Sequence, residues 1–277
     1  MQIVDYKSAE APKLFVESLR ETGFGVLENH PIDQNLVNSI YEKWQAFFDS
    51  DEKHQYQFDV EKQDGFFPFE TSETAKGFDV PDLKEFYHVY PWGRIPEHLK
   101  DDILEYYRRT SEFAAQLLSW IEQYSPSEVS ANYSEPLSQM IKDTPNTLLR
   151  VLHYPPLDGV EREGAVRAAA HEDINLITIL PAANAPGLQV KKKDGSWMDV
   201  PCNFGNLIVN IGDMLQEASG GYFPSTSHRV INPSGEEAKR SRISLPLFLH
   251  PRSEVKLSER HTQASYLLER LRELGVK

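Results

Sequence analysis

Apolar residues in the first half of the chain recur at the three- and four-residue spacing that is typical of helices. One apolar stripe over residues 14–19 predicts a helix that stops near Gly23, and residues 23–27 read as a short strand. Asp33 is a favourable N-cap for a second helix, and a third and longer helix is predicted over residues 96–124. The first half is therefore expected to be mainly helical.

Residues 62–93 interrupt this pattern with an irregular segment that is rich in aromatic rings. A loop of this composition is expected to cover another part of the molecule, because so many rings are unfavourable in water. We therefore predict that it forms a lid. The aromatic residues of this segment are Phe66, Phe67, Phe69, Phe78, Phe86, Tyr87, Tyr90 and Trp92.

From about Thr147 the pattern changes to short runs rich in Val, Ile, Leu and Phe, separated by turn residues. Many short strands at this spacing predict a β-sandwich or barrel. A closing helix follows Pro251. The predicted fold is mainly β with flanking helices, and the runs are TLLRVLHY, INLITIL, GLQVKK, WMDV, NLIVNI, HRVI and RISLPLFLH.

Composition and charge narrow the class of protein. The chain has 277 residues and a formal net charge of −13, which argues against a nucleic-acid partner. The longest uncharged run, residues 174–190, is broken by prolines and a glycine and is too short for a membrane span. The N-terminus lacks the features of a secretory signal, and Cys202 is the single cysteine. We therefore expect a cytoplasmic protein without a membrane segment, a disulfide or a cysteine-based metal site.

Three residues of the second half have the spacing of a metal site. In an extended segment His171 and Asp173 point to the same face, and His228 begins another predicted strand 55 residues later. Two imidazoles and one carboxylate on a β-scaffold match the facial triad of non-heme Fe(II), which leaves octahedral positions open for other ligands. Taken alone, His171-x-Asp173 is also compatible with an ordinary turn or a helix cap.

Arg242 and Ser244 lie on one face of the predicted strand RISLPLF, 14 residues after His228. A guanidinium binds a carboxylate through two hydrogen bonds, and a hydroxyl adds a third. The alternatives are an arginine exposed on an edge strand and one that points into a barrel able to hold a small ligand.

With these residues in this order, the chain resembles the isopenicillin N synthase-like branch of the 2-oxoglutarate and Fe(II)-dependent dioxygenases. The resemblance covers nearly the whole chain and rests on six segments: TGFGVLENHPID, the DLKE of residues 82–85, AAAHEDINLITIL, GLQVKKKDGSWMDVP, LIVNIGDMLQEASGGYFPSTSHRVINP and RISLPLFLHP. It implies a double-stranded β-helix, or jelly roll, over residues 141–277 with a closing C-terminal helix. Residues 1–140 would form a helical region packed on that core, not an independent domain.

The resemblance also implies the cofactors and the residues that bind them. His171, Asp173 and His228 match the iron ligands and the catalytic centre. Arg242, Ser244 and Tyr154 match the residues that hold 2-oxoglutarate, the cosubstrate used with O2. The implied reaction is the hydroxylation, desaturation or ring closure of a small organic substrate, and ascorbate is a possible stimulant.

Two departures from the family pattern are visible. Leu152 stands where the family often has an asparagine two residues before the tyrosine, and the segment between His228 and Arg242 is longer than in many plant members. Two alternatives stay open: an Fe(II) oxidase of the same fold that does not use 2-oxoglutarate, and a non-catalytic jelly roll that binds a small acid.

Five residues are candidates for the substrate pocket. Strand parity places Asn175 on the face of Asp173, where the alternative is a partner for the barrel backbone. The aromatic run after DLKE could line the pocket or belong to the core, and Arg150 could bind an acidic substrate or form a salt bridge between layers. The sequence indicates a small-molecule partner and no particular oligomeric state. These candidates are Asn175, Phe86, Tyr87, His88 and Arg150.

Overall fold

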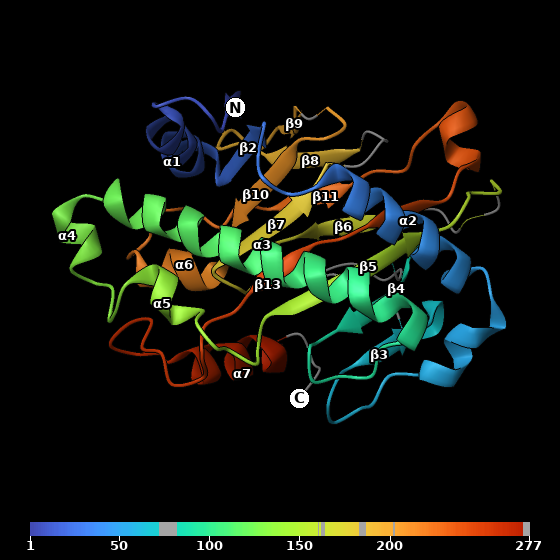
Figure 1. The fold of residues 1–277 in the computed structure, drawn as a ribbon. Coiled ribbons are helices and arrows are strands. Elements are labelled where there is room, and N and C mark those ends of the chain that lie inside the picture. The colour runs from blue at the N-terminus through green and yellow to red at the C-terminus, as the bar shows by residue number, and fades with distance from the viewer. Residues whose placement is uncertain (72–81, 160, 162–163, 183–186, 202, 274–277) are drawn as a thin grey trace.

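The computed structural model describes residues 1–71, 82–159, 161, 164–182, 187–201 and 203–273. Two β-sheets form the centre of the molecule, and helices cover the outer face of the larger one (Figure 1).

The larger sheet has nine strands in the order β1-β2-β10-β7-β13-β5-β4-β3, with β12 paired to β5 beside β13. All its pairs are antiparallel except β1 with β2. Its strands are β1 (Ile3–Asp5), β2 (Phe24–Glu28), β3 (Gly65–Phe67), β4 (Glu85–Val89), β5 (Leu148–Tyr154), β7 (Ile177–Pro181), β10 (Leu207–Ile211), β12 (Arg242–Ser244) and β13 (Leu247–Leu249).

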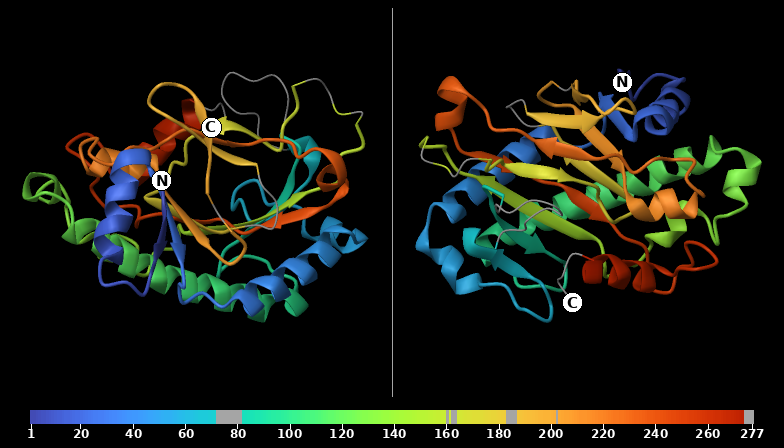
Figure 2. Two further views of the ribbon diagram at one scale, coloured as in Figure 1. Left: turned by 90° about the horizontal axis from the view of Figure 1, so that it is seen from above. Right: turned by 180° about the vertical axis from the view of Figure 1, so that it is seen from behind.

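The smaller sheet faces the inner side of the larger one, as the view from above shows (Figure 2). Its order is β6-β11-β8-β9, and the strands are β6 (Ala168–His171), β8 (Leu188–Lys191), β9 (Trp197–Asp199) and β11 (His228–Val230). From β5 to β8 and from β9 to β12 the chain passes from one sheet to the other at each strand, which is the pattern of a jelly roll. The predicted fold class is confirmed.

Three long helices lie on the outer face of the large sheet: α1 (Ala11–Thr22), α2 (Gln34–Phe48) and α3 (Glu97–Gln123). Gly23 ends α1 in the left-handed conformation, at φ 74°, which a glycine adopts without strain. The carboxylate of Asp33 accepts a hydrogen bond from the backbone of Asn35 (2.9 Å), so the predicted N-cap is confirmed.

The side chains of β10 alternate between the two faces of the large sheet. One face belongs to the apolar core beneath the helices, and the other faces the space between the sheets. Leu207, Val209 and Ile211 point to the outer face and join the core beneath the helices. Ile208 points inward and packs against residues of the small sheet, and Asn210 shares this inner face. The space between the sheets is therefore where polar side chains gather.

The remaining helices are short, apart from the closing one. They are α4 (Ser127–Ser130), α5 (Leu137–Met140), α6 (Asp213–Ala218) and α7 (Gln263–Glu273), with 3-10 turns η1 (Asp51–Tyr56), η2 (Phe69–Thr71) and η3 (Gly235–Lys239). The closing helix was predicted, and η3 lies in the long segment before Arg242. Among the described helices, none combines the length and the apolar composition that a membrane span requires.

The segment over residues 62–93 differs from the prediction of an irregular loop. It contributes β3 and β4, which extend the large sheet beyond β5. The prediction missed β4 because all five of its residues are buried, so the strand lacks the alternation that identifies a half-buried one. Residues 72–81 of the expected lid, including Phe78, lie outside the described residues, as does Cys202.

The sheet also crosses the predicted boundary at residue 140, since β2 pairs with β10 and β4 pairs with β5. The division into residues 1–140 and 141–277 stays a prediction.

Gly212 is a position where the fold leaves no room for a side chain. An added Cβ would collide with the backbone and side-chain oxygens of Asn175. We expect Gly212→Ala to lower the free energy of unfolding by about 1–3 kcal/mol, because neither oxygen can move without disturbing β7. Chemical denaturation measures this, and an unchanged midpoint would show that the loop relaxes freely.

Candidate metal centre and adjoining cleft

His171, Asp173 and His228 come together between the two sheets. One ligand atom from each lies within 4.8 Å of the others. Asp173 Oδ1 is 3.8 Å from His171 Nε2 and 3.9 Å from His228 Nε2. The two histidines face each other because β6 and β11 pair with His171 opposite His228. The predicted ligand set thus converges on one point.

Asp173 reaches this point by a different route from the one predicted. His171 is the last residue of β6, and Asp173 lies in the turn beyond the strand. Its backbone carbonyl accepts a hydrogen bond from Asp213 N (2.7 Å), at the start of α6. The carboxylate therefore owes its position to a fixed turn and not to strand parity.

Hydrogen bonds behind the ligands set which atoms face the centre. His171 Nδ1 lies 2.7 Å from the carbonyl of Ala169, and His228 Nδ1 lies 3.1 Å from that of Thr226. A carbonyl only accepts, so each Nδ1 carries the proton and each Nε2 has a lone pair for a metal. This arrangement orients ligands in metal sites generally.

The second oxygen of Asp173 is fixed in the same way. Oδ2 accepts hydrogen bonds from Thr178 Oγ1 and from Asn210 Nδ2 (2.8 Å), which leaves Oδ1 toward the imidazoles. Asn175 Nδ2 in turn donates to the Thr178 hydroxyl (3.0 Å) and to the carbonyl of Ile177 (2.8 Å). The side chain of Asn175 thus supports the β7 backbone and the carboxylate anchor.

Electrostatics suit the binding of a cation. Burial opposes the charged form of Asp173, but His228, His171 and the two hydrogen bonds hold the pKa of its carboxyl below the usual value. Burial and the neighbouring His171 lower the pKa of His228, which favours the neutral form. An ionised carboxylate and neutral imidazoles are the forms that bind a metal, so the residues fit the Fe(II) that the triad predicts.

The Thr178 hydroxyl allows a test of this supporting shell. We expect Thr178→Val, which keeps the side-chain shape, to weaken Fe(II) affinity by roughly 10–100-fold, since Asp173 loses one anchor. Anaerobic metal titration measures the effect. Thr110→Val, a buried threonine of α3, is the matched control and should bind iron as the unmodified protein does. Equal affinities in both variants would contradict the assigned role.

Arg242, Ser244 and Tyr154 occupy neighbouring positions at the junction of β12 and β5. Arg242 pairs with Tyr154 in register and Ser244 pairs with Leu152. The guanidinium carbon of Arg242 lies 5.8 Å from the centre of the Tyr154 ring. All four line the cleft that contains the metal centre, so the predicted cosubstrate residues and the predicted ligands share one cleft.

A second arginine, which the sequence did not indicate, stands behind this group. Arg167 is 1% exposed, and its guanidinium carbon lies 5.6 Å from the centre of the Tyr154 ring. Burial and the charge of Arg242 lower the pKa of Arg167. Arg242 is partly buried, and an anion would balance its charge and that of the buried Arg167, so the surroundings of Tyr154 suit a carboxylate.

A series of polar side-chain contacts lies on the opposite face of β5. Lys53 Nζ lies 3.1 Å from the Glu85 carboxylate, which contacts His153 Nδ1 at 2.7 Å, and His153 Nε2 lies 2.6 Å from Ser241 Oγ. Ser241 precedes Arg242, so this series of contacts fixes the register of the strand that carries the guanidinium.

The cleft between the sheets has a volume of about 1730 Å³. Its walls include the metal centre, the three predicted cosubstrate residues Arg242, Ser244 and Tyr154, and residues of α7. Of the five candidate pocket residues, Asn175, His88 and Arg150 line it. Tyr90 and Trp92, from the predicted lid, line it as well, and their rings stack at 4.5 Å.

Phe86 and Tyr87 are not among the described residues of the cleft wall. Tyr87 points to the opposite face of β4, packs on Trp44 and Phe47, and donates a hydrogen bond to the carbonyl of Arg94 (2.6 Å). The pocket interpretation of Tyr87 is therefore corrected: strand parity places it in the core.

Phe86 shares the inner face of β4 with His88 but is covered by another side chain. The guanidinium carbon of Arg150 lies 4.4 Å from the centre of its ring, and Arg150 Nε donates to His88 Nε2 (3.0 Å). Phe86 supports the cleft wall from behind. Leu152, in place of the asparagine of the family pattern, packs in the same small apolar cluster.

Comparison with known proteins agrees with this geometry. Residues 145–251 match the 2OG-Fe(II) oxygenase superfamily, and residues 4–125 match the N-terminal region described for the non-haem dioxygenase in morphine synthesis. A Shewanella oneidensis protein of known crystal structure, classed as an oxygenase, is 63% identical, with a TM-score of 0.92 over 100% of this chain and 99% of that one.

Two more distant relatives extend the comparison. Gibberellin 2-beta-dioxygenase 2 of Arabidopsis thaliana is 25% identical over 92% of this chain and 76% of its own length. A full-length Neurospora crassa protein, crystallised in complex with alpha-KG, has a TM-score of 0.79 at 22% identity over 98% of this chain and 95% of that one, which indicates the shared fold. Together with the ligand geometry, these matches confirm the predicted family: the chain belongs to the 2OG-Fe(II) oxygenase superfamily, as an oxidoreductase whose cofactors are Fe(II) and 2-oxoglutarate.

Proposed function

We propose that this chain couples the oxidative decarboxylation of 2-oxoglutarate to the oxidation of a small organic substrate. In the hydroxylation form, 2-oxoglutarate, O2 and R–H give succinate, CO2 and R–OH. In desaturation and ring closure the substrate loses two hydrogens, which leave with the second oxygen atom of O2 as water. The observation that carries the proposal is the convergence of His171, Asp173 and His228 in the same cleft as Arg242.

His171 Nε2, His228 Nε2 and Asp173 Oδ1 would hold Fe(II) on one face. Three protein ligands leave three octahedral positions for the cosubstrate and O2. The bound iron and cosubstrate supply the oxidising chemistry, and the protein supplies orientation and exclusion of water. The side chain of His171 is 40% exposed, whereas those of Asp173 and His228 are 6% and 10% exposed, so the open side of the centre faces the cleft at His171.

Arg242 would bind the distal carboxylate of 2-oxoglutarate through its planar fork, with Ser244 and Tyr154 adding hydroxyl groups. The nearby charge of Arg167 supports a dicarboxylate here, because the repulsion between two guanidinium groups falls when an anion binds. This observation favours the cosubstrate-dependent reaction over an Fe(II) oxidase that does not use 2-oxoglutarate.

The rest of the cleft would take the substrate. His88 and Arg150 form one wall, while Tyr90 and Trp92 contribute aromatic surface. Asn175 would act through Thr178 and Asp173, as a positioning residue. We place the enzyme in the cytoplasm, as the sequence predicts.

The test is succinate formation. Protein incubated with Fe(II), ascorbate, O2 and 2-oxoglutarate, alone and with a metabolite collection, should release succinate, and more of it when a substrate is present. Omission of iron or O2 should stop the release. Oxygen uptake without succinate would identify an oxidase, and iron binding without either would identify a non-catalytic binder.

A further inference from the structure

The end of the cleft beneath α7 has polar side chains that the metal and cosubstrate do not use. This region, which we call the α7 end, is formed by His250, Gln263 and neighbouring apolar residues. His250 follows β13, and Gln263 is the first residue of α7; both line the cleft. The apolar residues of the α7 end are Leu148, Pro246, Phe248, Leu267 and Leu271.

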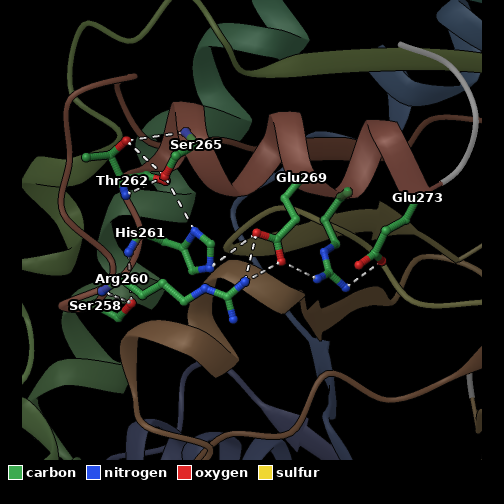
Figure 3. Close-up of polar contacts among 8 residues, drawn as sticks. Ser258, Arg260, His261, Thr262, Ser265, Glu269 and Glu273 are labelled. Carbon is green, nitrogen blue, oxygen red and sulfur yellow. Dashed lines mark hydrogen bonds and ion pairs between the residues drawn. The ribbon is translucent and has the colours of Figure 1, made fainter.

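Helix α7 is held firmly in this place by contacts at its exposed side (Figure 3). Thr262 N donates to Ser265 Oγ (3.0 Å), and the Ser265 hydroxyl lies 3.4 Å from His261 Nδ1. Arg260 pairs with Glu269 at 3.0 Å, one turn further along. These contacts link residues 260–262 to α7, which begins at Gln263.

The amide nitrogen of Gln263 has no hydrogen-bond partner among residues 1–71, 82–159, 161, 164–182, 187–201 and 203–273. The residue is 1% exposed, and its backbone N donates to the carbonyl of Val255 (2.9 Å). Its side-chain Nε2 is buried, and within the described part of the chain it makes no hydrogen bond. A buried donor without an acceptor is costly, and an acceptor brought by a ligand would remove that cost.

His250, directly after β13, carries a second buried polar atom of this kind. Its Nδ1 is buried and likewise has no hydrogen-bond partner among the residues that the structure describes. Burial lowers the pKa of His250 to about 4, so the imidazole is neutral and offers one donor and one acceptor.

The two side chains belong to one neighbourhood. Asn146 Nδ2 donates to the carbonyl of Pro251, next to His250, and to Ser253 Oγ (2.9 and 3.2 Å). Ser253 O accepts from Ala264 N, next to Gln263 (3.1 Å). The chain therefore returns to the same place after β13, and it brings both polar groups to one end of the cleft.

The cation that α7 itself brings to the cleft already has carboxylate partners. Arg270, which lines the cleft from the same helix, pairs with Glu269 (3.2 Å) and Glu273 (3.0 Å). A carboxylate only accepts hydrogen bonds, so it would match the Gln263 N–H and leave the acceptor nitrogen of His250 unmatched. An amide offers both an acceptor oxygen and a donor N–H, which match Gln263 and His250.

We propose that the α7 end is the subsite for the polar group of the primary substrate, and that this group is a neutral amide or lactam carried on an apolar body. Gln263 donates to the carbonyl oxygen, His250 bonds the amide nitrogen, and the apolar residues contact the body. The inference rests on the proposed function, since it assigns the substrate class of that same cleft.

The experiment is anaerobic titration calorimetry of the protein loaded with Fe(II) and 2-oxoglutarate. The probes are matched pairs on the same carbon skeletons, namely benzamide and benzoate, phenylacetamide and phenylacetate, and 3-phenylpropanamide and 3-phenylpropanoate. We expect at least one amide to bind roughly tenfold more tightly than its carboxylate, the scale of one or two matched hydrogen bonds. Gln263→Leu and the isosteric Gln263→Glu should both remove that preference.

Gln123→Leu, at the exposed end of α3, is the matched control and should keep the preference. Absence of binding by all three amides, preference for the carboxylates, or an unchanged preference in both Gln263 variants would each overturn the proposal. Carboxylate binding that is lost in Arg150→Leu would assign the polar group of the substrate to Arg150, whose guanidinium carbon lies 5.6 Å from the centre of the Phe248 ring, and would also overturn the proposal. Because no turnover occurs without O2, these results are independent of succinate formation, where a failure of the proposed function would appear.

Discussion

His171→Ala should contain no stoichiometric iron and should release no succinate at any concentration of 2-oxoglutarate. The variant loses one of three protein ligands, and the remaining pair cannot hold the metal on a defined face. Extra cosubstrate cannot rescue it, because the cosubstrate itself needs the metal. Iron content after desalting and succinate release measure the two effects.

His98→Ala is the matched control for this variant. His98 lies on α3 with a side chain that is 57% exposed, and its removal should change neither iron content nor succinate release. A His171→Ala protein with full activity would show that the iron lies elsewhere.

Arg242→Lys should retain iron and lose affinity for 2-oxoglutarate. Lysine keeps the charge but is a point donor without the planar fork, so it cannot bind a carboxylate through two parallel hydrogen bonds. Loss of part of a charge-assisted pair costs about 1.5–3 kcal/mol, which corresponds to a roughly 10–100-fold rise in the dissociation constant of 2-oxoglutarate. Raising the 2-oxoglutarate concentration should restore much of the activity.

The control for this second variant is Arg240→Lys, two residues earlier in the chain. The side chain of Arg240 is 71% exposed and pairs with Glu237 at the surface, so its replacement should leave cosubstrate affinity unchanged. If Arg242→Lys responds to substrate concentration instead, and 2-oxoglutarate has no effect even on the unmodified protein, the arginine binds the substrate. The chain would then function as an oxidase.

Together the two variants separate the roles of the cleft residues. The first loses the metal and everything that depends on it, while the second loses mainly the cosubstrate. If His171→Ala and Arg242→Lys lost iron and 2-oxoglutarate binding to the same extent, the common cause would be damage to the fold and not the loss of two separate binding functions.

The metal centre could be predicted from sequence because histidine and aspartate are common metal ligands and two of the three ligands are separated by one residue. His171-x-Asp173 and His228 precede or begin recognisable strands, and the structure brings them together. The strand β6 itself was harder to identify, since Ala168 to Ala170 carry no strand preference. Its conformation comes from pairing with β11, which is remote in sequence.

The pocket residues were less predictable, because their roles depend on contacts across the sheet. Tyr87 and His88 are adjacent, yet one enters the core and the other the cleft. The pairing of His88 with Arg150 decides which is which. Arg167 gave no signal, since Arg242, which lowers its pKa, is 75 residues away along the chain. The buried, unpartnered nitrogen of Gln263 is equally invisible without coordinates.

The most direct test of the central claim is an anomalous diffraction measurement at the iron absorption edge. Crystals would be grown anaerobically with Fe(II) and 2-oxoglutarate. The account predicts one iron peak bounded by His171 Nε2, His228 Nε2 and Asp173 Oδ1, and 2-oxoglutarate density that extends from it to Arg242. An iron peak at another place, or cosubstrate density away from Arg242, would contradict it.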